Sequence, residues 1–252
     1  MFQSVKFTWV QNLAGLLLIS TALISQPSNS ESSSCCSSVE SEKSVAIAAA
    51  EKSLLWMPES LRRVLSRHSE DAQDGIGGIL TQEFLTASEQ AGLESSFVQR
   101  VEAAVTKLQG RPRFSESAKD FGALAGMILM LNLPVSNSDR LRALGKVIAR
   151  NSAAFRIVVY DAADIGSRRD DMKEFLEGLR RRRARLSERF DEVESTELLA
   201  GSTGSLDPTS PLFGIAALVY THAINDTARI WLFVWRSANG DMAGRPSLEL
   251  KP

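Results

Sequence analysis

Two acid–base side chains share one face of a long apolar segment near the carboxyl end of the sequence. His222 and Asp226 are four residues apart, so they lie on the same side of a helix. Such a pair can share a metal ion or act as an oriented acid–base pair. A histidine that is hydrogen-bonded to an aspartate inside a core is the structural alternative. The spacing therefore indicates a residual polar pair, and both interpretations stay open.

The supply of metal ligands is small, because His68 and His222 are the two histidines of the chain. Metal-dependent phosphoesterases need several His and Asp side chains that converge on their ions, since these cations prefer imidazole nitrogen and anionic oxygen. His68 stands among charged residues and is expected at the surface. A site for three zinc ions cannot be assembled from this supply, and we predict no cofactor.

The strongest charge feature is a run of arginines inside a helix that we predict over 168–193. The apolar residues of this segment follow helical spacing and leave the arginines on the other faces. Acidic residues three or four positions away predict ion pairs along the helix. A solvated, salt-bridged face is one interpretation, and a patch that binds an anionic surface is the other. The patch consists of Arg180, Arg181, Arg182, Arg183 and Arg185.

These residues must be positioned by helices, because apolar residues recur with helical spacing from Val45 onward. The glycines of 75–78 are expected to break a helix, and the polar helical stretch before them argues against a phosphate-binding loop, which follows a strand. We predict an all-α, single-domain, multi-helix bundle over 45–252. Its later helices are expected over 82–90, 93–109, 116–132, 138–163, 168–193 and 211–238.

The last of these helices opens with Ser210 and Pro211, a capping residue followed by proline at the first helical position. The segment 212–235 is apolar almost all round. Charged and polar residues at its centre, among them Asp226 and Arg229, would each cost several kcal/mol in lipid. We therefore expect a buried central helix rather than a membrane span.

The amino end reads as an export signal. Residues 1–30 combine a weakly positive start with a short uncharged apolar run and a flank of small residues, so we predict a signal peptide rather than a permanent anchor. Residues 31–44 are rich in serine and are expected to be a disordered tether. Cys35 lies in this tether and could carry a lipid anchor, although no aliphatic residue stands three places before it. The expected location is periplasmic or secreted.

The net charge of the 252-residue chain is −1, so no overall field attracts nucleic acid, which is not an expected partner. Hydrophobic residues make up 44% of the sequence, which is enough to bury one sizeable core. The partner is unknown from sequence, and a lipid or protein ligand fits this composition.

A segment within the predicted core, 121–139 (FGALAGMILMLNLPVSNSD), resembles the central motif of the zinc-dependent phospholipase C family. That family shares its helical fold with the fungal single-strand nucleases. Gly122 and Pro134 stand where the motif has its glycine and its proline. The positions that correspond to metal ligands hold Gly126, Met130 and Ser136 instead.

A second element of that family pairs a histidine with a glutamate four residues later, with an aromatic residue directly before the glutamate. Phe155 keeps the aromatic position, while Ser152 and Arg156 occupy the two ligand positions. The resemblance follows the helix order over 45–240, and its specific part covers 121–156.

What the resemblance implies is a helical phosphodiester hydrolase, but the substitutions point elsewhere. Glycine and methionine offer zinc no suitable donor, and arginine brings positive charge to a cation site. Such losses remove the Lewis acid and the activated water on which the chemistry depends, and kinship of fold does not restore them. We therefore expect a non-catalytic exported protein that binds a ligand or partner or serves structurally. A phosphoesterase with a reduced or rearranged zinc site is the alternative, and an anionic-surface binder is a third.

Overall fold

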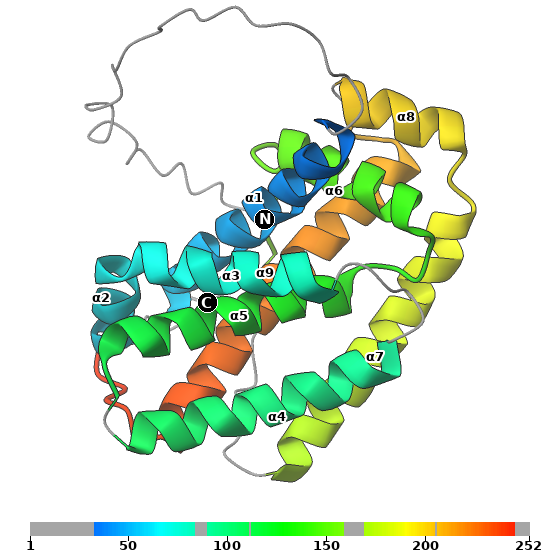
Figure 1. The fold of residues 1–252 in the computed structure, drawn as a ribbon. Helices are drawn as coiled ribbons and strands as arrows, with labels where there is room; N and C mark the ends of the chain where they lie inside the picture. The colour runs from blue at the N-terminus through cyan, green and yellow to red at the C-terminus, as the bar shows by residue number, and fades with distance from the viewer. Residues whose placement is uncertain (1–32, 84–89, 111, 159–168, 205, 245–252) are drawn as a thin grey trace, which may run out of the picture. The chain divides into compact units, whose positions relative to one another are not determined.

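The computed structural model describes residues 33–83, 90–110, 112–158, 169–204 and 206–244 (Figure 1). This part of the chain is all-helical, as predicted, and contains no strand. The helices are α1 (Ser33–Ser53), the 3-10 helix η1 (Leu54–Trp56), α2 (Glu59–Arg67), α3 (Ser69–Glu83), α4 (Gln90–Gln109), α5 (Phe114–Asn132), α6 (Ser138–Asn151), α7 (Arg169–Asp191), α8 (Ser195–Thr203) and α9 (Pro211–Ser237).

Helix α9 is the central helix of this assembly, running diagonally behind α3 and α5 in the view of Figure 1. Its start follows the predicted cap, because the Oγ of Ser210 accepts a hydrogen bond of 3.1 Å from the backbone of Phe213. Buried residues occupy most of its length, and it contacts α1, α4 and α5. The indole of Trp231 donates to the carbonyl of Phe121 at 2.9 Å, which fixes α9 against α5.

None of the helices in the described ranges combines the length and the apolar character that a membrane span needs.

The glycines at 75–78 do not break a helix, which corrects the prediction. Helix α3 continues through them because two glycines let it lie directly on α5. A Cβ at Gly75 would stand 2.0 Å from the carbonyl oxygen of Lys119, and a Cβ at Gly122 would stand 1.9 Å from that of Ala72. The two backbones therefore meet where neither helix has a side chain, and close approach compensates for the lower helix propensity of glycine.

One boundary in the amino-terminal half differs from expectation. Residues 33–44, expected to belong to a disordered tether, form the first turns of α1, so Cys35 is helical. Glutamate and lysine in this stretch are good helix formers, and extending an existing helix fixes one residue per added hydrogen bond. The predicted signal peptide, 1–30, lies outside the described residues. So does most of the helix predicted over 82–90, of which α3 includes the start.

The helix predicted over 138–163 ends early, at Asn151. The side chain of Asn151 donates to the carbonyl of Val147 at 2.8 Å, and the following residues turn away in non-helical conformation. Phe155 then packs against Phe213 and Tyr220, with ring centroids 5.1 and 5.9 Å apart. This aromatic cluster fastens the segment after α6 onto α9. Helix α8 was not predicted.

Candidate functional site

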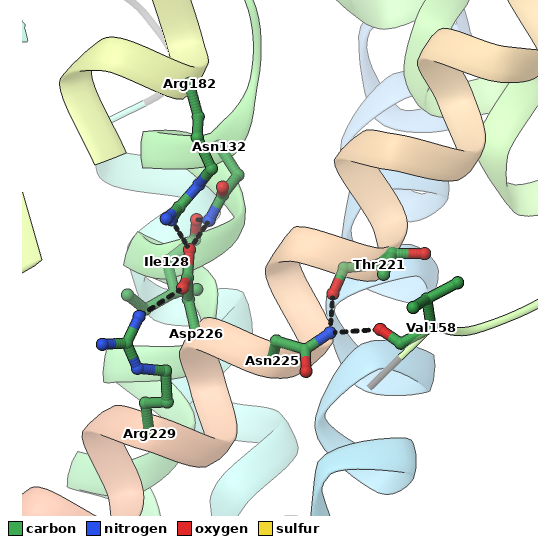
Figure 2. A network of polar contacts seen from close by, with 8 residues as sticks. All are labelled: Ile128, Asn132, Val158, Arg182, Thr221, Asn225, Asp226 and Arg229. Atoms are coloured by element: carbon green, nitrogen blue, oxygen red, sulfur yellow. Dashed lines mark hydrogen bonds and ion pairs between the residues drawn. The ribbon is translucent and has the colours of Figure 1, made fainter. Parts of the chain in front are cut away.

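The polar centre of α9 is built around the carboxylate of Asp226, which is only 2% exposed. Its Oδ2 accepts a hydrogen bond of 2.6 Å from Nη2 of Arg182 on α7 and one of 3.1 Å from Nδ2 of Asn132 on α5 (Figure 2). A buried carboxylate is stable when it is paired and hydrogen-bonded. Three helices therefore meet at this one charge.

A second guanidinium lies on the other side of the same carboxylate. Nη1 of Arg229, one helical turn beyond Asp226, stands 3.8 Å from Oδ1. The guanidinium carbon of Arg229 also lies 5.3 Å from the centre of the Phe175 ring on α7, within range of a cation–π contact. Asp226 is thus flanked by two positive charges, and Arg229 adds a second link between α9 and α7.

His222 lies one turn before Asp226 on α9, as the spacing predicted, and it is half-buried. Burial lowers the pKa of His222 below its ordinary value of 6.5, and the positive charge of Arg182 lowers it further, while Asp226 acts in the opposite direction. The imidazole is therefore neutral at pH 7. Two hydrogen bonds of Asp226 come from Arg182 and Asn132, so this carboxylate is part of an ion pair between helices.

Asn225 connects the polar centre to the segment that follows α6. Its Nδ2 donates to the carbonyl of Thr221 at 2.8 Å and to the carbonyl of Val158 at 3.0 Å (Figure 2). The second bond gives a partner to a backbone oxygen outside any helix. This side of α9 is therefore used to hold a neighbouring segment.

Gly126 and Met130, the first two ligand positions of the phospholipase C motif, lie one turn apart on α5. Gly126 is buried under α3, and a Cβ added there would stand 3.4 Å from the carbonyl oxygen of Ile76 and 3.5 Å from the Cβ of Ile79. Position 126 is thus inside a helix contact. Met130 is only partly buried and packs against the core. Of these two positions, Gly126 alone is therefore fully buried.

The three remaining ligand positions lie at the end of a helix or in the segments between helices. Ser136 is half-buried in the connection between α5 and α6. Ser152 caps the end of α6, where its Oγ donates to the carbonyl of Ala149 at 3.3 Å. The side chain of Arg156 is exposed.

These residues do not fit a zinc site of the family's type. Zinc requires about four donors of the Cys, His, Asp or Glu type in tetrahedral arrangement, and none of the five matched positions supplies one. Asp226, a buried carboxylate of the described core, is bound by a guanidinium that would repel a cation. Within the described residues no three His, Cys, Asp or Glu side chains are grouped as metal ligands would be.

The arginine run of α7 does not form one surface face, which changes the interpretation of the predicted patch. Arg181 and Arg185 are exposed, Arg182 reaches inward to Asp226, and Arg183 is buried. Arg182 and Arg183 turn inward because their positions fall on the same side of α7 as the buried Phe175 and Leu179.

Two ion pairs of the arginine run join α7 to other helices, which the sequence did not predict. Along α7 itself, Glu177 attracts Arg180, in keeping with the predicted spacing. Arg180 binds Glu94 of α4, with Nε 2.7 Å from Oε2, and Arg182 binds Asp226 of α9. The side chain of Glu94 is 14% exposed, so it is a second sheltered carboxylate.

Comparison with protein-family models, with curated proteins and with solved structures finds no match to this chain.

Sequence reasoning identified Asp226 and His222 but missed their true neighbours. Asn132 is the most informative omission, since it is the polar end of the apolar run 123–131 and an amide in such a place needs a partner. Glu94 gave no comparable signal, because one glutamate in a helix is ordinary. The inward direction of Arg182 could have been read from its seven-residue spacing to Phe175.

Proposed function

We propose that this chain is an exported, non-catalytic helical binding protein, related in fold to the zinc-dependent phospholipase C family but without its hydrolytic chemistry. The observation that carries the proposal is the state of Asp226. Its carboxylate is engaged by Arg182 at 2.6 Å and by Asn132 at 3.1 Å, so it is committed to holding α5, α7 and α9 together.

A hydrolytic role would require groups that this centre does not bring together. Activation of water needs either a metal ion or a general base within reach of it. His222 is neutral and could accept a proton, but a guanidinium occupies the carboxylate that would orient it. The five positions that match the family's ligands offer serine, glycine, methionine and arginine. These features support binding over catalysis.

Hydrolysis assays with the purified chain test the proposal. The substrates are phosphatidylcholine vesicles and single-stranded DNA, each with and without added zinc. We expect no product above the buffer background under any of these conditions. His222→Ala is the matched variant, because it removes the imidazole that could accept a proton from water.

Turnover that requires zinc and disappears in His222→Ala would overturn the proposal in favour of a phosphoesterase with a rearranged site. Export is tested separately by mass spectrometry of the processed protein. We expect a new amino terminus between Ser25 and Ser30, and a processed protein that retains Met1 would contradict it.

A further inference from the structure

Arg183 is the one arginine of the run on α7 that is buried without an ionic partner among the described residues. Its side chain is 8% exposed, and its Nε is buried with no hydrogen-bond partner. The ion pairs that α7 forms with described carboxylates use Arg180 and Arg182. Arg183 stands directly beside both.

The carboxylates nearby are already in use. Glu94 attracts Arg183 electrostatically but is bound by both Nε and Nη2 of Arg180. Asp226 is bound by Arg182 and flanked by Arg229. Glu94 and Asp226 are thus each bound in direct contact by another arginine, and Arg183, which contacts neither of them directly, is the most buried arginine of the run.

Burial of a guanidinium without a carboxylate in direct contact among the described residues is costly, because the charge loses water and gains only the more distant attraction of Glu94. Burial accordingly lowers the pKa of the Arg183 guanidinium below its ordinary value. An arginine remains charged at neutral pH even so. The arrangement is one that a bound negative charge would stabilise.

We propose that Arg183, with Arg180 and Arg182 beside it, forms a binding site for a small oxyanion, a phosphate or carboxylate group. This deepens the proposed binding role, on which it rests, by naming the class of ligand. Guanidinium groups bind both oxyanions through paired hydrogen bonds of matched geometry. A side chain so little exposed does not suit a bilayer or a nucleic-acid backbone, which require an open basic surface, so the ligand is a small molecule.

Thermal unfolding of the purified full chain, measured with increasing inorganic phosphate at ionic strength held constant with sodium chloride, tests this site. We expect Tm to rise with the logarithm of the phosphate concentration above the Kd, by about 5 °C or more at roughly a hundred times the Kd. Sodium acetate in a parallel series separates the two ligand groups. A rise with either salt supports the site and identifies the oxyanion that it prefers.

Arg183→Met is the decisive variant, because it keeps the length of the side chain and removes the charge. We expect it to lose the response while its Tm without added anion is unchanged or higher, as replacing an uncompensated charge should do. Arg185→Met, at an exposed position of the same helix, is the control and should keep the full response. The control also corrects for general stabilisation by phosphate.

Equal responses in the wild-type chain and in Arg183→Met would overturn the site. So would an Arg183→Met chain that is strongly destabilised, together with a wild-type chain that does not respond, since Arg183 would then be paired within the protein. Calorimetric titration of the wild-type chain with phosphate and with acetate decides the matter if the variant does not fold, because absent heat in both contradicts the inference. The two proposals fail on different measurements. Hydrolysis of a phosphodiester would refute the non-catalytic role, whereas the anion-binding site stands or falls on the responses to phosphate and acetate alone.

Discussion

At the scale of single residues, the polar centre compensates the charge of one carboxylate that is buried in the core. Asp226 is buried, and its neighbours Arg182, Asn132 and Arg229 supply the positive charge and the hydrogen bond that it needs. Ion pairs of this kind are sensitive to removal of one partner, because the other charge remains buried. The polar centre therefore helps to select how the helices pack, and it also stabilises that packing.

Replacing Asp226 by Asn should destabilise the fold by about 3 kcal/mol, since Arg182 loses its counter-ion and Asn132 loses a charged acceptor. Chemical denaturation measures the change in the free energy of unfolding. Asp139→Asn is the comparison, because the ion pair of Asp139 with Arg142 is largely exposed and is worth less than about 1 kcal/mol. Equal changes in the free energy of unfolding would show that the buried ion pair stabilises the fold no more than the exposed one.

His222 should make the protein less stable in acid. Its pKa in the folded chain is lowered, chiefly by burial, so below pH 6.5 the unfolded chain binds the proton more readily than the folded one. This histidine therefore favours folding fully above pH 6.5, and the contribution declines as pH falls from 6.5 toward the lowered pKa. Tm measured between pH 7.5 and pH 5 should fall less steeply in His222→Asn.

The control for this pH series is His68→Asn, which removes the half-exposed histidine that pairs with Asp71. It should retain the slope of the wild-type chain. If the slope of Tm against pH survives in His222→Asn and disappears in His68→Asn, the pH dependence comes from His68, and the prediction is contradicted.

At the scale of elements, the closest contact of the fold is the crossing of α3 and α5. Gly75 and Gly122 each lie against a backbone carbonyl of the other helix, closer than any Cβ could. The crossing also determines what surrounds Gly126, since the same face of α5 continues under α3. A position that aligns with a metal ligand in the resembling family is thus devoted to packing here.

Gly75→Ala should destabilise the fold by about 3 kcal/mol, because the added methyl group meets rigid backbone on α5. Gly78→Ala on the same helix is the matched control. A Cβ at position 78 would enter open space, so the gain in helix propensity should stabilise the chain by roughly 0.5–1 kcal/mol. Denaturant unfolding of the two variants should give shifts of opposite sign, and two stabilising shifts would contradict the close crossing.

The sequence predicted elements well where periodicity and caps coincide and poorly where tertiary contacts decide. The start of α9 follows from Ser210 and Pro211, which act locally. The continuation of α3 through Gly75 could not be predicted in this way, because glycine is unfavourable in a helix until a second helix lies against it. The end of α6 at Asn151 depends likewise on contacts of the next segment with α9.

At the scale of the whole molecule, the all-α class was predicted correctly from helical spacing, and the pairing within the site was not. His222 and Asp226 share a face of α9 as expected, yet their electrostatic partner comes from α7, more than 40 residues earlier in the sequence. Spacing along one helix does not reveal which other helix packs there. For the same reason the arginine run was predicted only in part, since Arg182 and Arg183 turn inward while Arg180, Arg181 and Arg185 are exposed.

The central claim is that the polar centre of α9 is an ion-paired anchor and not a metal site. Calorimetric titration of the purified chain with zinc at pH 7 tests it most directly, since Asp226 cannot bind zinc without releasing Arg182. We predict no stoichiometric binding in the wild-type chain and no difference between it and His222→Ala. Tight binding of one or more zinc ions per chain, lost in His222→Ala and in Asp226→Asn, would contradict the account.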